Sequence, residues 1–183
     1  MSAVPAPVRD VEDMIPADCH GMNFYESDPA FRILLEHYMA PDLHGHLVPH
    51  LDRLGALAGG RLDELARIAD RHAPVLHPRD SFGRDEDWIE YHPSYRAMEK
   101  IAFDEFGLHA MSHRPGVLDW PEPMGALAKY AVKYLFVQGE FGLMCPVSLC
   151  DTAAFMVNRY AAPEIRDRYL PRMTAETREE MWT

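Results

Sequence analysis

Prolines and glycines divide most of this 183-residue sequence into short amphipathic segments, and this division restricts the chain to a mostly helical fold. In residues 28–41, Asp28 can cap a helix and Pro29 suits its first turn. Apolar residues then recur at three- and four-residue intervals until Pro41 ends the pattern. Residues 61–74 repeat the arrangement, so the sequence predicts a series of helices joined by short connectors.

The rest of the chain fits the same interpretation with one exception. Further helices are expected over residues 42–60, 93–107, 124–139, 146–160 and 163–171, the first of them kinked by Pro49. Residues 75–92 have a polar, glycine-containing centre between apolar flanks, which predicts a short hairpin or an ordered loop. Residues 1–25 are proline-rich and are expected to form an extended arm.

Charge and hydropathy exclude several classes of protein. The formal net charge is -11 and spreads along the chain, so binding to nucleic-acid phosphates is not expected. The apolar stretch at residues 138–159 contains Glu140 and Asp151, which leave a run too short for the roughly 20 apolar residues that span a bilayer. The N-terminus lacks the apolar core of a signal peptide. We therefore expect a cytoplasmic protein that does not enter a membrane.

Four histidines beside Asp42 form the clearest metal-site candidate. His46 and His50 are four residues apart and could hold zinc on one helix face, with His37 and His44 nearby. However, Pro49 distorts that helix, and the glutamate of an HExxH motif is missing. Surface or capping histidines are the simpler interpretation, so we predict no metal site.

The three cysteines give no redox motif. Cys145 and Cys150 lie five residues apart, with a proline after the first, and Cys19 is far away in sequence. A reduced, cytoplasmic setting and packing as small apolar side chains are favoured over a redox pair. The sequence contains no glycine-rich phosphate loop and no nucleophile elbow. The residues by themselves therefore identify no catalytic group.

The end of the chain resembles a known family. Residues 162–183 read "APEIRDRYLPRMTAETREEMWT" and are similar to the segment that closes the N-terminal helical domain of acyl-CoA dehydrogenases. In that family a charged helix ending in an aromatic residue and "LP" or "LG" leads into the first strand of the middle β-domain. Residues 168–171 match this pattern, and Met181 and Trp182 would begin the strand.

The sequence upstream of residue 162 extends the resemblance. "EFGLMCPVSLCDTAAFMVNRYA" is similar to the two helices that face the acyl chain and the flavin, and "GVLDWPEP" and "EYHPSYRAMEKIAFDE" resemble the alkylation-response (adaptive response) branch. The resemblance implies three parts: an arm at residues 1–25, an acyl-CoA dehydrogenase N-terminal-domain-like helical bundle at 26–180 with one hairpin or loop insertion, and the start of a truncated middle β-domain at 181–183.

The family implies FAD, an acyl thioester or related substrate, αβ-dehydrogenation and a homotetramer for a full-length parent. The flavin-contacting motif and the catalytic glutamate of the family would both lie beyond residue 183. We therefore expect no catalytic residue within this sequence, FAD bound only by the parent, and no activity from this fragment alone.

The resemblance also implies pocket residues. Cys145, Ser148, Leu149 and Thr152 are expected to form one wall of the acyl pocket, although they could instead pack between helices. Two other functions remain open. The chain could be a free-standing helical interaction module without catalysis, or part of an alkylation-response protein with weak dehydrogenase activity.

Overall fold

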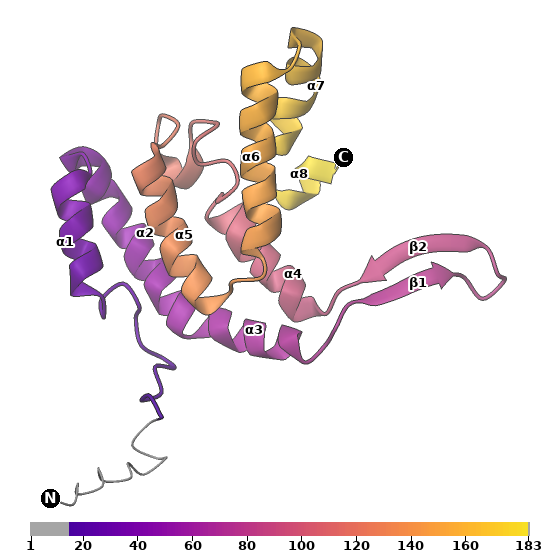
Figure 1. The fold of residues 1–183 in the computed structure, drawn as a ribbon, viewed down its shortest axis with the longest axis horizontal. Helices are drawn as coiled ribbons and strands as arrows, with labels where there is room; N and C mark the ends of the chain where they lie inside the picture. Colours follow the sequence, from indigo (N-terminus) through magenta and orange to yellow (C-terminus); the bar gives the residue numbers. More distant parts are fainter. Residues whose placement is uncertain (1–14, 183) are drawn as a thin grey trace, which may run out of the picture.

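The chain is mostly helical, with one two-stranded hairpin (Figure 1). The computed structural model describes residues 15–182, so most of the expected arm and Thr183 lie outside the described residues. The elements in order are α1 (Pro29–Tyr38), α2 (Pro41–Gly59), α3 (Arg61–Asp70), β1 (Val75–Arg79), β2 (Asp85–Glu90), α4 (Pro93–Lys100), the π-helical turn η2 (Ile101–Glu105), the 3-10 turn η3 (Val117–Asp119), α5 (Ala126–Gly139), α6 (Met144–Tyr160), α7 (Pro163–Met173) and α8 (Arg178–Trp182). The prediction of a mostly α fold is confirmed.

Local sequence signals set the helix starts. The backbone N–H of Phe31 donates to Asp28 Oδ1 at 2.8 Å, and Pro29 is the first residue of α1, as the sequence predicted. The backbone N–H of Ser94 donates to His92 Nδ1 at 3.2 Å ahead of α4, which begins with Pro93. Helix α6 begins at Met144, two residues before the expected proline.

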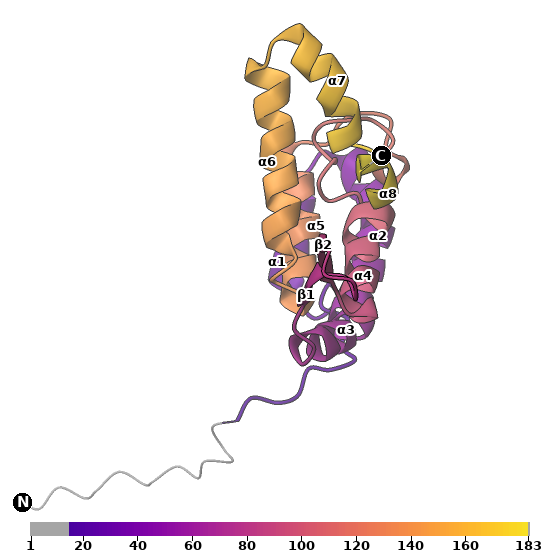
Figure 2. The same ribbon diagram turned by 90° about the vertical axis from the view of Figure 1, so that its right-hand side faces the viewer.

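Helix α2 is central to the core and packs against α3 and α5. Helix α4 packs on α3. Apolar residues at helical spacing on each of these helices face inward. The largest fully buried side chains are Phe106, Phe136, Leu35, Leu47, Leu51, Leu54, Leu62, Met98, Leu108, Met111, Leu135 and Leu143. Helix α6 begins in this core with Met144 and Val147, and its far end pairs with α7 beyond the body (Figures 1 and 2).

Residues 21–25 pack on α2, although we expected them in an extended arm. The backbone N–H of Gly21 donates to the carbonyl oxygen of Gly59 at 2.6 Å, and that of Phe24 to the carbonyl oxygen of Gly55 at 3.1 Å. The Tyr25 side chain is buried in the core. These residues therefore belong to the helical body, and they owe this position to backbone hydrogen bonds that periodicity does not reveal.

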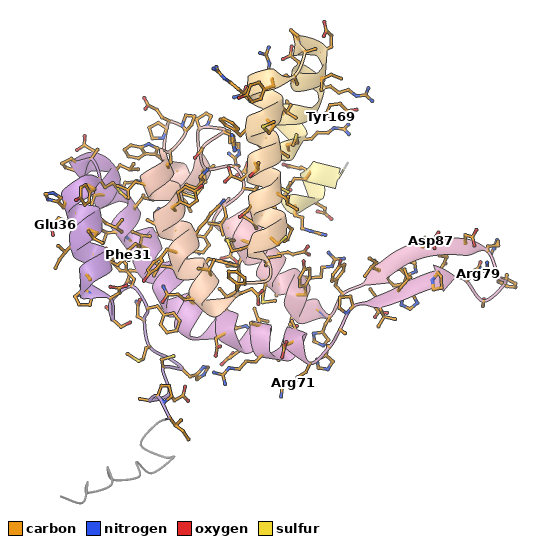
Figure 3. All side chains as sticks on the ribbon, in the orientation of Figure 1. Phe31, Glu36, Arg71, Arg79, Asp87 and Tyr169 are labelled. Atoms are coloured by element: carbon orange, nitrogen blue, oxygen red, sulfur yellow. The ribbon has the colours of Figure 1, made fainter. Side chains whose placement is uncertain are left out.

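The insertion at residues 75–92 is a hairpin that points away from the helices (Figure 1). Strands β1 and β2 are antiparallel, and His77 stacks on Trp88 with ring centroids 4.2 Å apart. Arg79 and Asp87 both lie out on the hairpin (Figure 3), where Arg79 Nε pairs with Asp85 at 3.3 Å. Hydrogen bonds between the strands and these side-chain pairs hold the hairpin together.

The C-terminal residues are helical, which corrects the strand expected at residues 181–183. Met181 and Trp182 lie in α8, and Thr183 is not described. The Glu180 N–H donates to Thr177 Oγ1 at 3.3 Å, and the Thr177 N–H to Glu180 Oε2 at 3.4 Å. This reciprocal arrangement is a capping box, which satisfies the first backbone donors of a helix locally. A strand at this position would need a neighbouring strand, and within residues 15–182 strands occur only in the distant hairpin.

Candidate functional site

A groove between α5 and α6 has a volume of about 670 Å³. Apolar and aromatic side chains form most of its walls. It is lined by Tyr130, Lys133, Tyr134 and Val137 of α5, Phe141 and Gly142 of the connecting turn, and Met144, Cys145 and Ser148 of α6. The α5 residues recur at three- and four-residue intervals, so they share one helix face. We call this cavity the α5–α6 groove.

The structure divides the four residues that the sequence assigned to an acyl pocket. Cys145 and Ser148 line the α5–α6 groove. Leu149 instead lines a second cavity of about 400 Å³ with Tyr169 and other residues of α6, α7 and α8 (Tyr169 is labelled in Figure 3). Thr152 is exposed and lines neither cavity. One residue along a helix turns the side chain by about 100°, which is why Ser148 and Leu149 face different sides of α6. Their role in an acyl pocket stays a prediction.

A buried charged cluster joins α5 and α6 beside the groove. Asp151 of α6 accepts hydrogen bonds from Lys133 Nζ at 2.7 Å, Lys129 Nζ at 3.1 Å and His113 Nε2 at 2.8 Å. The side chains of these four residues are between 6% and 13% exposed. We call these residues the Asp151 cluster. It connects two helices and the loop between η2 and η3.

Hydrogen bonding determines the ionisation of this cluster. Burial by itself would raise the pKa of Asp151, but hydrogen bonds from His113, Lys133 and Lys129 outweigh it and hold the pKa well below its usual value. Burial lowers the pKa of Lys133, and the hydrogen bond and charge of Asp151 counteract this lowering. Because three donors converge on one carboxyl group, we take Asp151 as ionised.

Sequence reasoning missed this cluster. It treated Asp151 only as a charge that interrupts an apolar stretch. A signal was present, however: Lys129 and Lys133 are four residues apart on a helix with an otherwise apolar face, and Asp151 lies at an inward position of the next helix. Charged residues at such positions are seldom buried without a partner, so their pairing could have been inferred.

The histidine candidates lie apart from the groove. His46 Nε2 donates to the carbonyl oxygen of Leu118 at 2.7 Å, and the rings of His46 and His50 are 5.3 Å apart. Burial lowers the pKa of His50, and the nearby His46 adds to this effect. Within residues 15–182, no group of three or more His, Cys, Asp or Glu side chains is arranged to hold a metal ion.

The cysteines are all free thiols, and their environments differ. Cys145 is exposed at the groove wall, so of the two expected positions, core or pocket wall, it does not occupy the core. Cys150 is half-buried between α6 and the C-terminal segment, where burial raises the pKa of its thiol. Cys19 is exposed. Among the described helices, none has both the length and the hydropathy needed to cross a bilayer.

Comparisons with known proteins identify the family. The sequence profile of the adaptive response protein AidB N-terminal domain matches residues 15–180. The solved structure of Bd2924 in its apo form is similar, with a TM-score of 0.77 and 26% identity, over 88% of this chain and 31% of that one. No curated protein matches the chain. This chain therefore belongs to the family of adaptive response protein AidB N-terminal domains, which are N-terminal domains of the acyl-CoA dehydrogenase type.

Proposed function

We propose that this chain is the N-terminal part of an acyl-CoA dehydrogenase-like FAD oxidoreductase, in which the α5–α6 groove forms one wall of the acyl pocket. The observation that carries the proposal is the apolar groove of about 670 Å³ in a domain of this family. The chain spans 31% of the length of Bd2924, so the remaining parts of such an enzyme would be supplied by a longer protein. That protein would be a cytoplasmic homotetramer without membrane or nucleic-acid contacts.

The groove has the properties that an acyl chain requires. From Tyr130 to Val137 its α5 wall is roughly 10 Å long at 1.5 Å per residue. Each methylene removed from water in such a groove stabilises the complex by about 0.8 kcal/mol. Val137, Phe141 and Met144 offer apolar contact along the groove. These residues would hold the acyl group and exclude water from it.

The chemistry requires groups that we do not assign to this chain. Bound FAD would accept a hydride from the β-carbon while a glutamate removes the α-proton, in a site closed to water. We assign neither the glutamate nor any flavin-contacting residue within residues 15–182. The contribution of this chain is therefore binding and orientation of the acyl group.

The test uses the longest protein that contains this sequence. We expect it to purify with flavin absorbance, and we expect acyl-CoA thioesters to bleach that absorbance. Ser148→Phe should shift the preference toward shorter acyl chains because it fills the groove, whereas Thr152→Phe, outside the groove, should leave the preference unchanged. A purified protein without flavin, or flavin that no acyl-CoA reduces, would reject the proposal.

A second candidate is a helical interaction module without catalysis. It is favoured by apolar side chains that α6 exposes away from the groove, including Leu149 at 65%, Phe155 at 53% and Tyr160 at 69% exposure. Exposed apolar patches of this kind often mark protein contacts. The same flavin measurement separates the two functions. An alkylation-response protein with weak dehydrogenase activity would bind flavin and reduce it only slowly.

A further inference from the structure

The Asp151 cluster has more positive than negative charge. Lys129 and Lys133 each contribute one positive charge and Asp151 one negative charge, so 2 − 1 leaves a net charge of +1 without counting His113. The charged side chains that shift the pKa of Lys133 are Asp151, which raises it, and Lys129, which lowers it. A net charge among side chains that are at most 13% exposed is costly unless an anion or water balances it.

This charge lies at the groove. Lys133 is itself one of the groove-lining residues, and its ammonium group has three N–H donors, of which the described contacts use one, toward Asp151. The ring of Tyr130, which also lines the groove, lies 5.1 Å from Lys129 Nζ and 6.0 Å from Lys133 Nζ. Lys133 can therefore contact an anion in the groove directly, and Lys129, whose ammonium group pairs with the same Asp151 oxygen, adds positive charge beside it.

The opposite end of the groove is apolar. Val137 lies one turn beyond Lys133 along α5, and Phe141 and Gly142 follow in the turn that leads to Met144. Among residues 15–182, no acidic side chain lines the groove, and Asp28 accepts a hydrogen bond from the hydroxyl of the groove residue Tyr134 at 2.9 Å. The groove thus changes along its length from a basic end at Lys133 to an apolar end at Phe141.

We propose that the α5–α6 groove binds an apolar chain that ends in a carboxylate, with the carboxylate at Lys133 and Lys129 and the chain directed toward Phe141. A carboxylate there would receive charge-assisted hydrogen bonds and would neutralise the excess charge of the cluster. The inference rests on the proposed function in naming a substrate class: the acyl group would carry a carboxylate at the end remote from the thioester.

Binding is tested on the 183-residue chain with two probes of equal chain length, decanoate and 1-decanol, by isothermal titration calorimetry. The wild type should bind decanoate about tenfold more tightly than 1-decanol, since hydrogen bonds to charged groups contribute roughly this much. Lys129→Met leaves a balanced Lys133–Asp151 pair, so it should reduce the ratio to about one while 1-decanol affinity stays constant. Lys129→Arg should keep the preference.

Two controls locate the site. Lys100→Met removes an exposed lysine at the end of α4 and should leave the affinity ratio unchanged. Ser148→Trp should abolish binding of both probes because it fills the groove, and Thr152→Trp should not. Circular dichroism and the melting temperature verify that each variant folds. If Lys129→Met fails to fold, the wild-type ratio still decides, and it should fall with added salt.

The outcomes separate this inference from the proposed function. Equal affinities in the wild type, or an unchanged ratio in folded Lys129→Met, would overturn the carboxylate site. In the longer protein, flavin reduced equally well by acyl-CoAs with and without a terminal carboxylate would also overturn it, and the proposed function would stand. A decanoate preference in a protein that binds no flavin would support the site and reject the oxidoreductase.

Discussion

Gly59 of α2 lies against the main-chain carbonyl group of Met22, so closely that a Cβ at position 59 would overlap the oxygen. A Cβ at Gly55, one turn earlier on the same face, would likewise overlap the side-chain oxygen of Asn23 and the backbone nitrogen of Tyr25. The two glycines thus make a strip on α2 without side chains, on which residues 21–25 run and form their hydrogen bonds.

This contact predicts opposite effects of the same substitution at two positions of α2. Gly59→Ala should lower the free energy of unfolding by about 2 kcal/mol, because residues 21–25 must move away from the helix. Gly45→Ala should raise it by roughly 0.5–1 kcal/mol, since a Cβ there meets nothing within 4 Å and alanine favours a helix. Urea denaturation measures both. Equal stabilities would show that residues 21–25 do not need the glycine.

His109 predicts how stability depends on pH. Its side chain is fully buried, its Nε2 donates to the carbonyl oxygen of Ala175 at 3.1 Å, and burial lowers its pKa to about 4. The unfolded chain binds the proton near pH 6.5 and the folded chain only near pH 4. The contribution of neutral His109 to the free energy of unfolding is therefore fully present above pH 6.5. It is lost as the pH falls toward 4, and the total loss is about 3 kcal/mol.

The corresponding experiment compares unfolding free energies at pH 7 and pH 4.5. His109→Gln keeps a side-chain N–H donor for Ala175 and does not titrate, so its stability should fall less over this range than that of the wild type. His37→Gln, at an exposed position of α1, should retain the wild-type slope. If His109→Gln and wild type lose stability in parallel, His109 is not the responsible group.

The Asp151 cluster predicts a large effect of a nearly isosteric change. Asp151→Asn leaves two lysines without a negative partner and should cost about 3–5 kcal/mol. Asp87→Asn, on the exposed hairpin, should change stability by less than about 0.5 kcal/mol. The pKa of Asp151 is lowered in the folded state, so its contribution is complete at neutral pH and is lost as the pH falls below about 4. Guanidinium titrations of both variants at pH 7 test this difference.

Structural features that depend on only a few neighbouring residues could be predicted from the sequence. Asp28 and Pro29 specify the start of α1 through contacts within four residues, and the same is true of α4. The strand expected at Met181 was wrong because the family pattern outweighed a local signal, the Thr177 and Glu180 capping box. At this position the local capping signal was the more reliable guide.

The site could be predicted only in part. Helical spacing indicates which residues share a face of α6, but it does not say which neighbour covers that face. Ser148 faces α5, whereas Leu149 faces α7, and this depends on how the helices cross. The excess charge at Lys133 also arises from packing of two helices, because Lys129 and Asp151 meet only in the folded chain.

The hairpin packs mainly on itself and has few contacts with the helices. All of β2 is exposed, and His77 is the only half-buried residue of β1. The chain segments on either side of the hairpin contact each other without it, because the rings of His72 and His92 stack with centroids 4.4 Å apart. Isolated two-stranded hairpins are at best marginally stable in water, so this one contributes little to the core.

We therefore expect that the hairpin can be removed without unfolding the domain. Replacing residues 75–90 with a short glycine-serine linker between Pro74 and Tyr91 should change the free energy of unfolding by less than about 1 kcal/mol, since loop closure depends weakly on length. Leu51→Ala, in the buried face of α2, should cost about 2–5 kcal/mol and shows the scale of a core defect. Loss of a cooperative melting transition in the shortened chain would instead show that the hairpin stabilises the helical body.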